Sequence, residues 1–275
     1  MEEATWTIRK VLEWTARDFA ARGIESARLD AELLVAAALG IDRVGLYLDL
    51  DRPLTEAERT GIRLLVTRRR GREPVAYILG YKDFYGRRFS VNHNVLIPRP
   101  DTETLVERLL ACVPEDRPCR VLDLGTGSGI IAITVAAERP LAKVTATDLS
   151  KEALSLALDN AEAHGVTDRV SFELADLCAS AGSYDVIASN PPYIESAVIA
   201  ELQPEVRDYE PSLALDGGAD GLDVVRRMLA KLLSVCEPGA QLLMELGMGQ
   251  APKVRALLCE QPAWELAAVH LDLAQ

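Results

Sequence analysis

The second half of the chain alternates between short apolar runs and longer segments with helical periodicity, and this alternation constrains the fold more than any other feature. Helical patterns such as 151–164 and 223–235 lie between the apolar runs. The expected strands are residues 121–124, 143–148, 170–173, 184–189 and 241–246. Strands that alternate with helices favour a parallel sheet covered by helices on both faces. The sequence therefore predicts an α/β domain with a doubly wound, mostly parallel sheet.

Residues 1–80 carry a different pattern, in which apolar residues recur at helical spacing. The amphipathic run 27–39 is followed by Gly40, a common helix stop. Thr55 and Glu58 fit a capping box at the start of a further helix. We therefore expect an all-helical bundle over residues 1–80.

Two short β-prone runs, 84–91 and 94–97, follow this helical region and are bounded by turn residues. They predict a β-hairpin linker over residues 81–98. The alternation of strands and helices begins downstream of this linker. The α/β domain is therefore assigned to residues 99–275.

Three consecutive arginines, Arg68, Arg69 and Arg70, end the helix that the capping box begins. Cations near a helix C-terminus complement the helix dipole, so we interpret this run as a solvated helix end. A less favoured interpretation is a docking patch for an acidic partner.

The composition is that of a globular protein, with 49% hydrophobic and 26% charged residues. No apolar run approaches the ~18 residues of a membrane span. The five cysteines are scattered, without the paired spacing of a zinc site or a disulfide framework. We expect a reduced, cytoplasmic protein that contains no metal site and does not bind membranes.

The net charge of −12 falls outside residues 1–80, which hold 13 basic and 13 acidic residues. Nucleic-acid enzymes usually carry a basic footprint, because neutralising phosphates supplies much of their affinity. The acidic second half therefore favours a small cationic or zwitterionic cofactor, or a protein substrate. Direct nucleic-acid binding is not expected.

A glycine-rich turn joins the first expected strand of the α/β domain to the helical run 130–138. Its residues are Asp123, Gly125, Thr126, Gly127, Ser128 and Gly129, with Leu124 between the first two. Glycines at this position let the backbone turn tightly and approach a ligand. The turn is not the dinucleotide fingerprint, because Ile130 stands where a glycine is needed, and it is not a P-loop. The turn favours a nucleoside-containing ligand without a pyrophosphate.

Carboxylates follow the next two expected strands. Asp148 ends the second, where a carboxylate can bind ribose hydroxyls, although it lies a few residues beyond the usual spacing. Asp176 and Leu177 follow the third, where they can meet an adenine amine and its face. Each aspartate alone is more often a helix cap. Because the carboxyl ends of parallel strands bind ligands, the glycine turn and these residues together predict a nucleoside site.

The fourth expected strand ends in the turn Asn190-Pro191-Pro192-Tyr193. Prolines have no N–H to donate, so this turn offers the side-chain oxygen of Asn190 and the carbonyl of Pro191 as acceptors, beside one aromatic face. Such a surface suits a planar NH₂ group. Asn-Pro and Pro-Pro are also ordinary turn formers, so the tetrapeptide alone is weak evidence. In a sheet with the strand order 3-2-1-4, the fourth strand lies beside the first. The acceptor turn would then lie beside the nucleoside site, and the two would form one site.

These motifs resemble those of the class I methyltransferases that act on planar nitrogen with S-adenosylmethionine. More narrowly, the chain resembles the peptide chain release factor glutamine methyltransferase family (HemK/PrmC). The residues that carry the resemblance are 123–129, 148 and 190–193, supported by 27–34, 72–80, 84–86, 95–103 and 217–222. The segment Ile97-Pro98-Arg99-Pro100 beside a helical domain is more specific than the acceptor turn alone.

The resemblance implies a Rossmann-like fold, S-adenosylmethionine as cofactor and S-adenosylhomocysteine as product. It implies methylation of the glutamine side chain in the Gly-Gly-Gln loop of bacterial class I release factors, with the helical domain recognising the protein substrate. Asn190 and Pro191 would accept from the glutamine amide, Pro192 would stiffen the turn and Tyr193 would pack on the amide plane. Asn190 would also border the cofactor. Leu177 departs from the family, which often has an aromatic residue there.

The predicted mechanism uses no general base. The amide nitrogen of glutamine is a poor nucleophile, and positive charge develops on it as the methyl group is transferred. Acceptors fixed in advance at Asn190 and Pro191 would stabilise that charge. No His, Cys or Lys accompanies the turn, so we expect a pH–rate profile without a histidine-like inflection.

Three alternatives to this function remain at the level of the sequence. A glutamine methyltransferase of a ribosomal protein would carry the same acceptor turn. An adenine-N6 methyltransferase of nucleic acid would need stacking aromatics and a basic channel, which an aromatic content of 5% does not favour. A non-catalytic adaptor would not need the intact glycine turn and acceptor turn.

Overall fold

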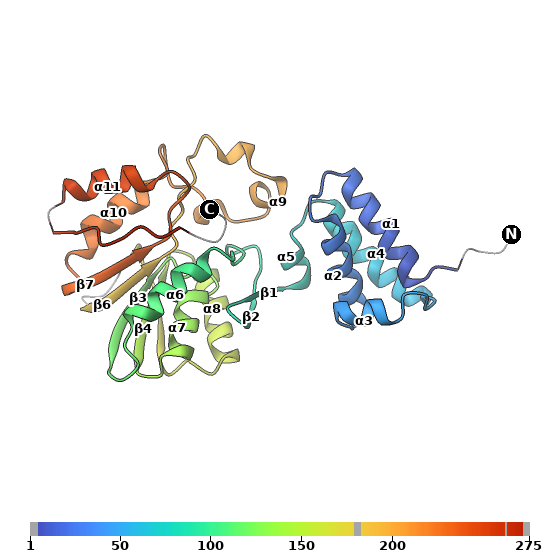
Figure 1. Cartoon of the computed structure of the whole chain (residues 1–275), viewed down its shortest axis with the longest axis horizontal. Helices are drawn as coiled ribbons and strands as arrows, with labels where there is room; N and C mark the ends of the chain where they lie inside the picture. Colours follow the sequence, from blue (N-terminus) through green and yellow to red (C-terminus); the bar gives the residue numbers. More distant parts are fainter. Residues whose placement is uncertain (1–4, 179–182, 262, 272–275) are drawn as a thin grey trace. The chain divides into compact units, whose positions relative to one another are not determined.

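The computed structural model describes residues 5–178, 183–261 and 263–271. The chain folds into two compact units (Figure 1). The helical unit comprises residues 1–80 and 204–209, and the sheet unit comprises residues 81–203 and 210–275. The helical unit therefore includes a short segment that lies far from it in the sequence.

From residue 5 onward, where the structure describes it, the helical unit has five helices near the N-terminus and one short helix from the distant segment. These are α1 (Ile8–Ala21), α2 (Ala27–Leu39), α3 (Arg43–Leu48), α4 (Glu56–Arg70), α5 (Val75–Leu79) and α9 (Pro204–Arg207). The capping box predicted at Thr55 and Glu58 is present, and Gly40 ends α2 in the left-handed conformation. Phe19, Leu34 and other apolar side chains form one buried core.

The predicted solvated helix end is wrong for Arg69, whereas the side chains of Arg68 and Arg70 are 43% and 38% exposed. The Arg69 side chain is only 5% exposed and forms ion pairs with Asp30 and Glu205, both at 2.7 Å. Arg72 also pairs with Glu205, at 2.7 Å. The acidic partners of Arg69 thus come from α2 and α9 of this same unit, while Arg68 pairs with Glu73 and Arg70 with Asp18 of α1. Glu205 lies 136 residues from Arg69 in the sequence, so no local pattern could indicate this partner.

The described part of the sheet unit contains five parallel strands in the order β5-β4-β3-β6-β7. This matches the predicted order 3-2-1-4, because β3, β4, β5 and β6 are the first four expected strands. The strands are β3 (Cys119–Leu124), β4 (Ala142–Asp148), β5 (Val170–Leu174), β6 (Tyr184–Ser189) and β7 (Cys236–Met244). Strand β7 begins five residues before the expected 241, because its turn-like opening Glu237-Pro238-Gly239 belongs to the strand beside a register shift.

Alternate residues of the central strands pack on opposite faces of the sheet. On one face, Val121 of β3 and Val186 of β6 join the core formed with α6 (Thr102–Cys112), α7 (Ile130–Glu138) and α8 (Lys151–Ala163). On the other face, Leu122 and Ile187 pack against Met228 of α10 (Asp223–Leu232). Helix α11 (Ala251–Cys259) packs against α10 through a further apolar cluster. The unit is the expected doubly wound, Rossmann-like α/β fold.

The sheet unit begins with a small antiparallel hairpin of β1 (Tyr81–Phe84) and β2 (Arg87–Ser90). The run 94–97, which we expected as a strand, is not one. Val95 and Ile97 are nevertheless buried. The apolar residues of this run therefore pack in the core as part of a loop, not as a strand. Between β6 and α10 lie α9 and two short 3-10 helices, Ile199–Glu201 and Ser212–Ala214.

Candidate active site

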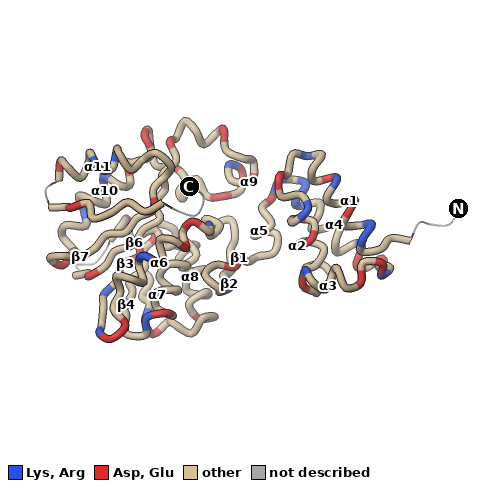
Figure 2. Tube along the Cα trace, viewed as in Figure 1, with Lys and Arg blue, Asp and Glu red and all other residues tan. Residues whose placement is uncertain are grey.

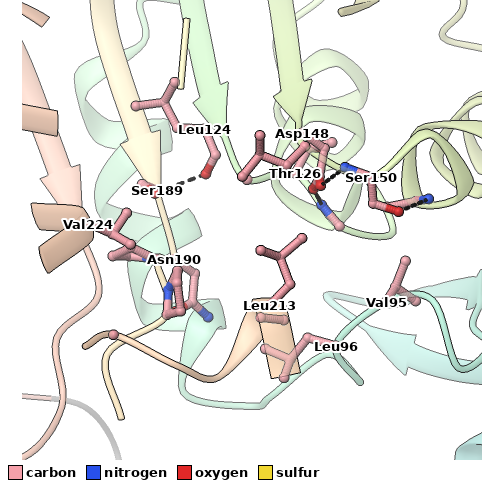
Figure 3. A pocket seen from close by; sticks show the side chains of 18 of the residues that line it. Val95, Leu96, Leu124, Thr126, Asp148, Ser150, Ser189, Asn190, Leu213 and Val224 are labelled. Carbon is pink, nitrogen blue, oxygen red and sulfur yellow. Dashed lines mark hydrogen bonds between the residues drawn. The ribbon is translucent and has the colours of Figure 1, made fainter. Parts of the chain in front are cut away.

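A cavity of about 580 Å³ opens at the carboxyl ends of the parallel strands (Figure 3). Its wall brings together the glycine turn after β3, the end of β4, the loop after β5 and the acceptor turn after β6. The predicted site residues on the wall are Gly125, Thr126, Gly127, Ser128, Asp148, Asp176, Leu177, Asn190, Pro191 and Pro192. Asp123, Gly129 and Tyr193 do not line the cavity. The cavity has the size of small-molecule sites in proteins.

The glycine turn adopts the conformation that its sequence requires. Gly125, Gly127 and Gly129 all have positive φ, at 70°, 56° and 85°. At Gly129 two features oppose a side chain. The positive φ would strain any residue with a Cβ, and the added Cβ would lie 2.7 Å from Cδ1 of Ile133. This close approach packs the first turn of α7 against its own entry loop and leaves the preceding glycines open toward the cavity.

Asp123 lies fully buried beneath the glycine turn. Its Oδ2 accepts hydrogen bonds from the Thr126 hydroxyl (2.6 Å) and from the backbone N–H of Ala132 (3.2 Å). Its Oδ1 is buried without a hydrogen-bond partner among the described residues. Burial, and to a lesser extent the nearby Asp148, raises the pKa of Asp123 to about 7. Asp123 therefore supports the glycine turn through hydrogen bonds and does not itself line the cavity.

Asp148 links the end of β4 to the glycine turn. One carboxylate oxygen accepts from the backbone N–H of Gly127 and the other from that of Ser150, both at 2.9 Å. Figure 3 shows Asp148 beside Thr126 and Ser150 on one side of the cavity, with Asn190 on the other side in this view. The carboxylate thus shapes the turn and also faces the space where a ligand would bind.

Asp176 and Leu177 form the wall after β5. Leu177 has a positive φ of 69°, which is unusual for a residue other than glycine, and its carbonyl accepts a hydrogen bond from the Thr147 hydroxyl. Asp176 forms an ion pair with Arg227 of α10, and its carbonyl accepts from Lys231 at 2.6 Å. Sequence reasoning missed Arg227, because nothing local distinguishes it from other surface arginines.

The acceptor turn follows β6 directly. The Ser189 hydroxyl donates to the Leu124 carbonyl at 2.9 Å, which ties the ends of β6 and β3 together (Figure 3). Asn190 and Pro191 then line the cavity. No described residue donates a hydrogen bond to the Asn190 side-chain oxygen or to the Pro191 carbonyl. Both acceptors are therefore available to a ligand.

Two residues from later in the chain support the acceptor turn, one through a hydrogen bond and one through close backbone packing. Gln250 is buried and donates to the Tyr193 carbonyl at 2.9 Å. Gly217 packs so closely that an added Cβ would lie 2.8 Å from the Pro192 carbonyl oxygen. Gly217 belongs to a segment that carried the family resemblance, whereas no pattern in the sequence indicated Gln250.

Tyr193 does not line the cavity, and its hydroxyl is turned toward a residue beyond β7. Its hydroxyl lies 3.5 Å from Glu245, the residue that follows β7, and burial raises its pKa to about 12, with Glu245 adding to the shift. Glu245 also accepts from the Thr102 hydroxyl at 2.7 Å. Burial raises the pKa of Glu245, although hydrogen bonds from Thr102, Tyr193 and Asn190 oppose this. Thr102 lies in the segment 95–103 that supported the family resemblance, although no role was predicted for it, and sequence reasoning missed Glu245.

The wall suits S-adenosylmethionine by its chemistry. Two carboxylates, Asp148 and Asp176, can accept from hydroxyl or amino groups, and Leu149 and Leu177 offer apolar contact to a purine. The open glycines at 125 and 127 let the ligand approach the backbone. Within the described ranges, no cluster of three or more His, Cys, Asp or Glu side chains could hold a metal ion. The described part of the chain also has no helix long and apolar enough to cross a membrane.

Comparisons with known proteins identify the family of this chain. Residues 10–80 match the PrmC N-terminal domain family, and residues 100–203 match the methyltransferase small domain family. The release factor glutamine methyltransferase of Geobacter sulfurreducens is 49% identical over 90% of this chain and 87% of its own. That of Chlorobaculum tepidum is 43% identical over 94% and 91%.

Among solved structures, the hMettl16 catalytic domain, determined in complex with the MAT2A 3'UTR hairpin 6, shares the fold. It has a TM-score of 0.53 at 15% identity and covers 77% of this chain and 76% of its own. Fold and cavity together define an S-adenosylmethionine-dependent methyltransferase with a Rossmann-like catalytic unit. The relatives in sequence define the family within this class. Because they are 43–49% identical over most of both chains, the chain belongs to the release factor glutamine methyltransferase family.

Proposed function

We propose that this protein methylates the side-chain amide nitrogen of the glutamine in the Gly-Gly-Gln motif of bacterial class I release factors. The observation that carries the proposal is the pair of free acceptors, Asn190 and Pro191, on the wall of a cavity that fits the cofactor. The names of the relatives supply the target protein. The reaction would take place in the cytoplasm, where these factors act on ribosomes.

The acceptor turn suits a primary amide. An NH₂ group donates two hydrogen bonds, and Asn190 Oδ1 and the Pro191 carbonyl can each accept one. S-adenosylmethionine, when bound, supplies an electrophilic methyl group on a sulfonium. As the glutamine nitrogen forms its new bond it gains positive charge, and the two fixed acceptors stabilise this charge more than that of the neutral amide. The same hydrogen bonds orient the nitrogen for attack.

Proton removal does not require a residue of this cavity. No His, Cys or Lys is among the residues that line it. Once methylated, the amide nitrogen carries a strongly acidic proton, which can pass to water after the methyl group has transferred. We therefore assign no general base.

We propose that the helical unit recognises the release factor and that nucleic acid is not a direct substrate. In Figure 2, Lys and Arg residues are interspersed with Asp and Glu along the described chain. The net charge of −12 lies in residues 81–275, which include the cavity. A duplex or single strand would gain little phosphate neutralisation from such a surface.

The test is methyl transfer from labelled S-adenosylmethionine to three substrates side by side. These are a purified class I release factor, the same factor with its Gly-Gly-Gln glutamine changed to alanine, and an adenine-containing oligonucleotide. Label on the unchanged factor alone is the expected result. Label on the oligonucleotide, or equal label on both factors, would contradict the proposal. A mixture of ribosomal proteins tests the alternative protein target in the same format.

A further inference from the structure

We propose that Thr102 and Glu245 are positioning residues that orient the Asn190 side chain, so that its oxygen rather than its NH₂ group faces the cavity. This inference rests on the proposed function, in which Asn190 accepts a hydrogen bond from the substrate amide. It assigns a role to Glu245, which no sequence pattern singled out, and to Thr102, which lies in the segment 95–103 of the family resemblance but had no role there.

The three residues meet because the ends of β6 and β7 are paired. Met244 pairs with Ser189, and the backbone N–H of Glu245 then donates to the Ser189 carbonyl at 3.0 Å. Glu245 and Asn190 are therefore the first residues beyond two neighbouring strands. Thr102, the fully buried first residue of α6, contacts both of them.

The direction of the hydrogen bonds follows from what each group can donate. An ionised carboxylate only accepts, so the Thr102 hydroxyl must donate its single proton to Glu245, at 2.7 Å. The Thr102 oxygen can then only accept, and its neighbour at 3.1 Å is Nδ2 of Asn190. An Asn190 amide turned by 180° would place two acceptors against each other. The chain Asn190–Thr102–Glu245 therefore selects one orientation of the amide.

This orientation has two consequences for the reaction. First, Nδ2 of Asn190 is engaged by Thr102, so Oδ1 is the polar atom of this cavity-lining side chain that no described residue binds. Second, hydrogen bonds in a chain polarise one another. The charge of Glu245 thus increases the negative charge on Oδ1, both through Thr102 and through the hydrogen bond from Asn190 itself. This strengthens the acceptor as positive charge develops on the substrate nitrogen. Tyr193 donates to the other oxygen of Glu245 and helps to fix the carboxylate.

The activity test compares Thr102→Val with Thr102→Ser. Removing a group that orients a functional ligand typically costs about 10- to 100-fold. We expect Thr102→Val to lower kcat by this factor with unchanged cofactor Kd, and Thr102→Ser to restore most of kcat. The matched control is Thr134→Val, which removes a buried hydroxyl on α7 that has no partner in the described structure. Equal losses in the valine and serine variants would overturn the proposal.

Combining Thr102→Val with Asn190→Ala tests whether Thr102 acts through Asn190. If it does, the double variant is no slower than Asn190→Ala alone, whereas independent roles would give additive losses. Additive losses would overturn the inference, because Thr102 would then contribute to the reaction without Asn190.

A readout without the substrate separates this inference from the proposed function. The side-chain NH₂ resonances of Asn190, identified by their loss in Asn190→Ala, are followed in protein saturated with S-adenosylhomocysteine. We expect Thr102→Val and Glu245→Gln to shift them and Thr134→Val to leave them in place. Unshifted resonances in the first two variants would overturn the inference. Absence of methyl transfer to the release factor by the unchanged enzyme would instead contradict the proposed function.

Discussion

The backbone N–H of Gly127 donates a hydrogen bond to the Asp148 carboxylate at 2.9 Å. One side chain at the end of β4 thus holds the glycine turn that follows β3. Because the same carboxylate lies on the cavity wall, we expect both the shape of the turn and the affinity for the cofactor to depend on this one residue.

Asp148→Ala should weaken the binding of S-adenosylmethionine by about 10- to 100-fold, since it removes both a ligand contact and the support of the turn. Isothermal titration with S-adenosylhomocysteine measures the effect. The matched control is Asp159→Ala, an exposed aspartate on α8. Unchanged affinity in Asp148→Ala would show that the carboxylate has no role in binding.

Asn190→Ala should affect turnover more than cofactor binding. Loss of one preorganised group that stabilises transition-state charge costs about 10²- to 10³-fold in kcat. Measuring kcat under saturating substrates, together with the Kd for S-adenosylhomocysteine, separates the two effects. A variant whose Kd rises as much as its kcat falls would place Asn190 in the cofactor site alone.

The rate should fall on the acid side as Glu245 becomes protonated. Burial raises the pKa of Glu245 above its ordinary value of 4.5, Asp101 adds to the rise, and hydrogen bonds from Thr102, Tyr193 and Asn190 oppose it. The ionised form orients Asn190, so activity is present above this raised pKa and is lost as the pH falls through it. The kcat profile of the unchanged enzyme should show this acid limb, and that of Glu245→Gln should be lower and flat over the same range.

Asp123 should make the protein without cofactor less stable as the pH rises. Its folded-state pKa of about 7 lies above the ordinary 3.8, because burial penalises the charged form. Its favourable contribution is complete below the lower value and is lost as the pH rises through the upper one, with a slope of at most about 1.4 kcal/mol per pH unit. In urea unfolding at several pH values, Asp123→Asn should gain stability relative to the unchanged protein between pH 5 and pH 8. A constant difference would mean that Asp123 titrates normally.

Arg69→Met should destabilise the helical unit by about 3–5 kcal/mol, because it leaves the buried carboxylate of Asp30 without its cation and removes one of the two cations that pair with Glu205. Arg63→Met is the matched control, since Arg63 is an exposed residue on the same helix and should change the free energy of unfolding by less than about 0.5 kcal/mol. Denaturant unfolding measures both, and similar values for the two variants would contradict the role of the ion pairs.

The sequence could predict the features that depend on neighbouring residues. Strand β6 and the turn at Asn190 are adjacent in the chain, and the spacing of glycines after β3 specifies a turn without reference to anything distant. The strand order followed from the general behaviour of doubly wound sheets. These elements placed most of the cavity wall.

The interactions that the sequence did not indicate join residues far apart in the chain. Thr102 and Glu245 are separated by 143 residues, and Arg69 and Glu205 by 136. A threonine at a helix start and a glutamate after a strand are common in any protein, so only the fold distinguishes them. The same holds for Tyr193, whose hydroxyl is turned toward Glu245 by contacts that its own motif does not contain.

The most direct measurement is tandem mass spectrometry of a class I release factor after incubation with the enzyme and S-adenosylmethionine, beside a reaction with Asn190→Ala. The account predicts a single methyl group on the glutamine side chain of the Gly-Gly-Gln peptide, and strongly reduced modification with the variant. A methyl group on another residue, or full modification of that glutamine by Asn190→Ala, would contradict it.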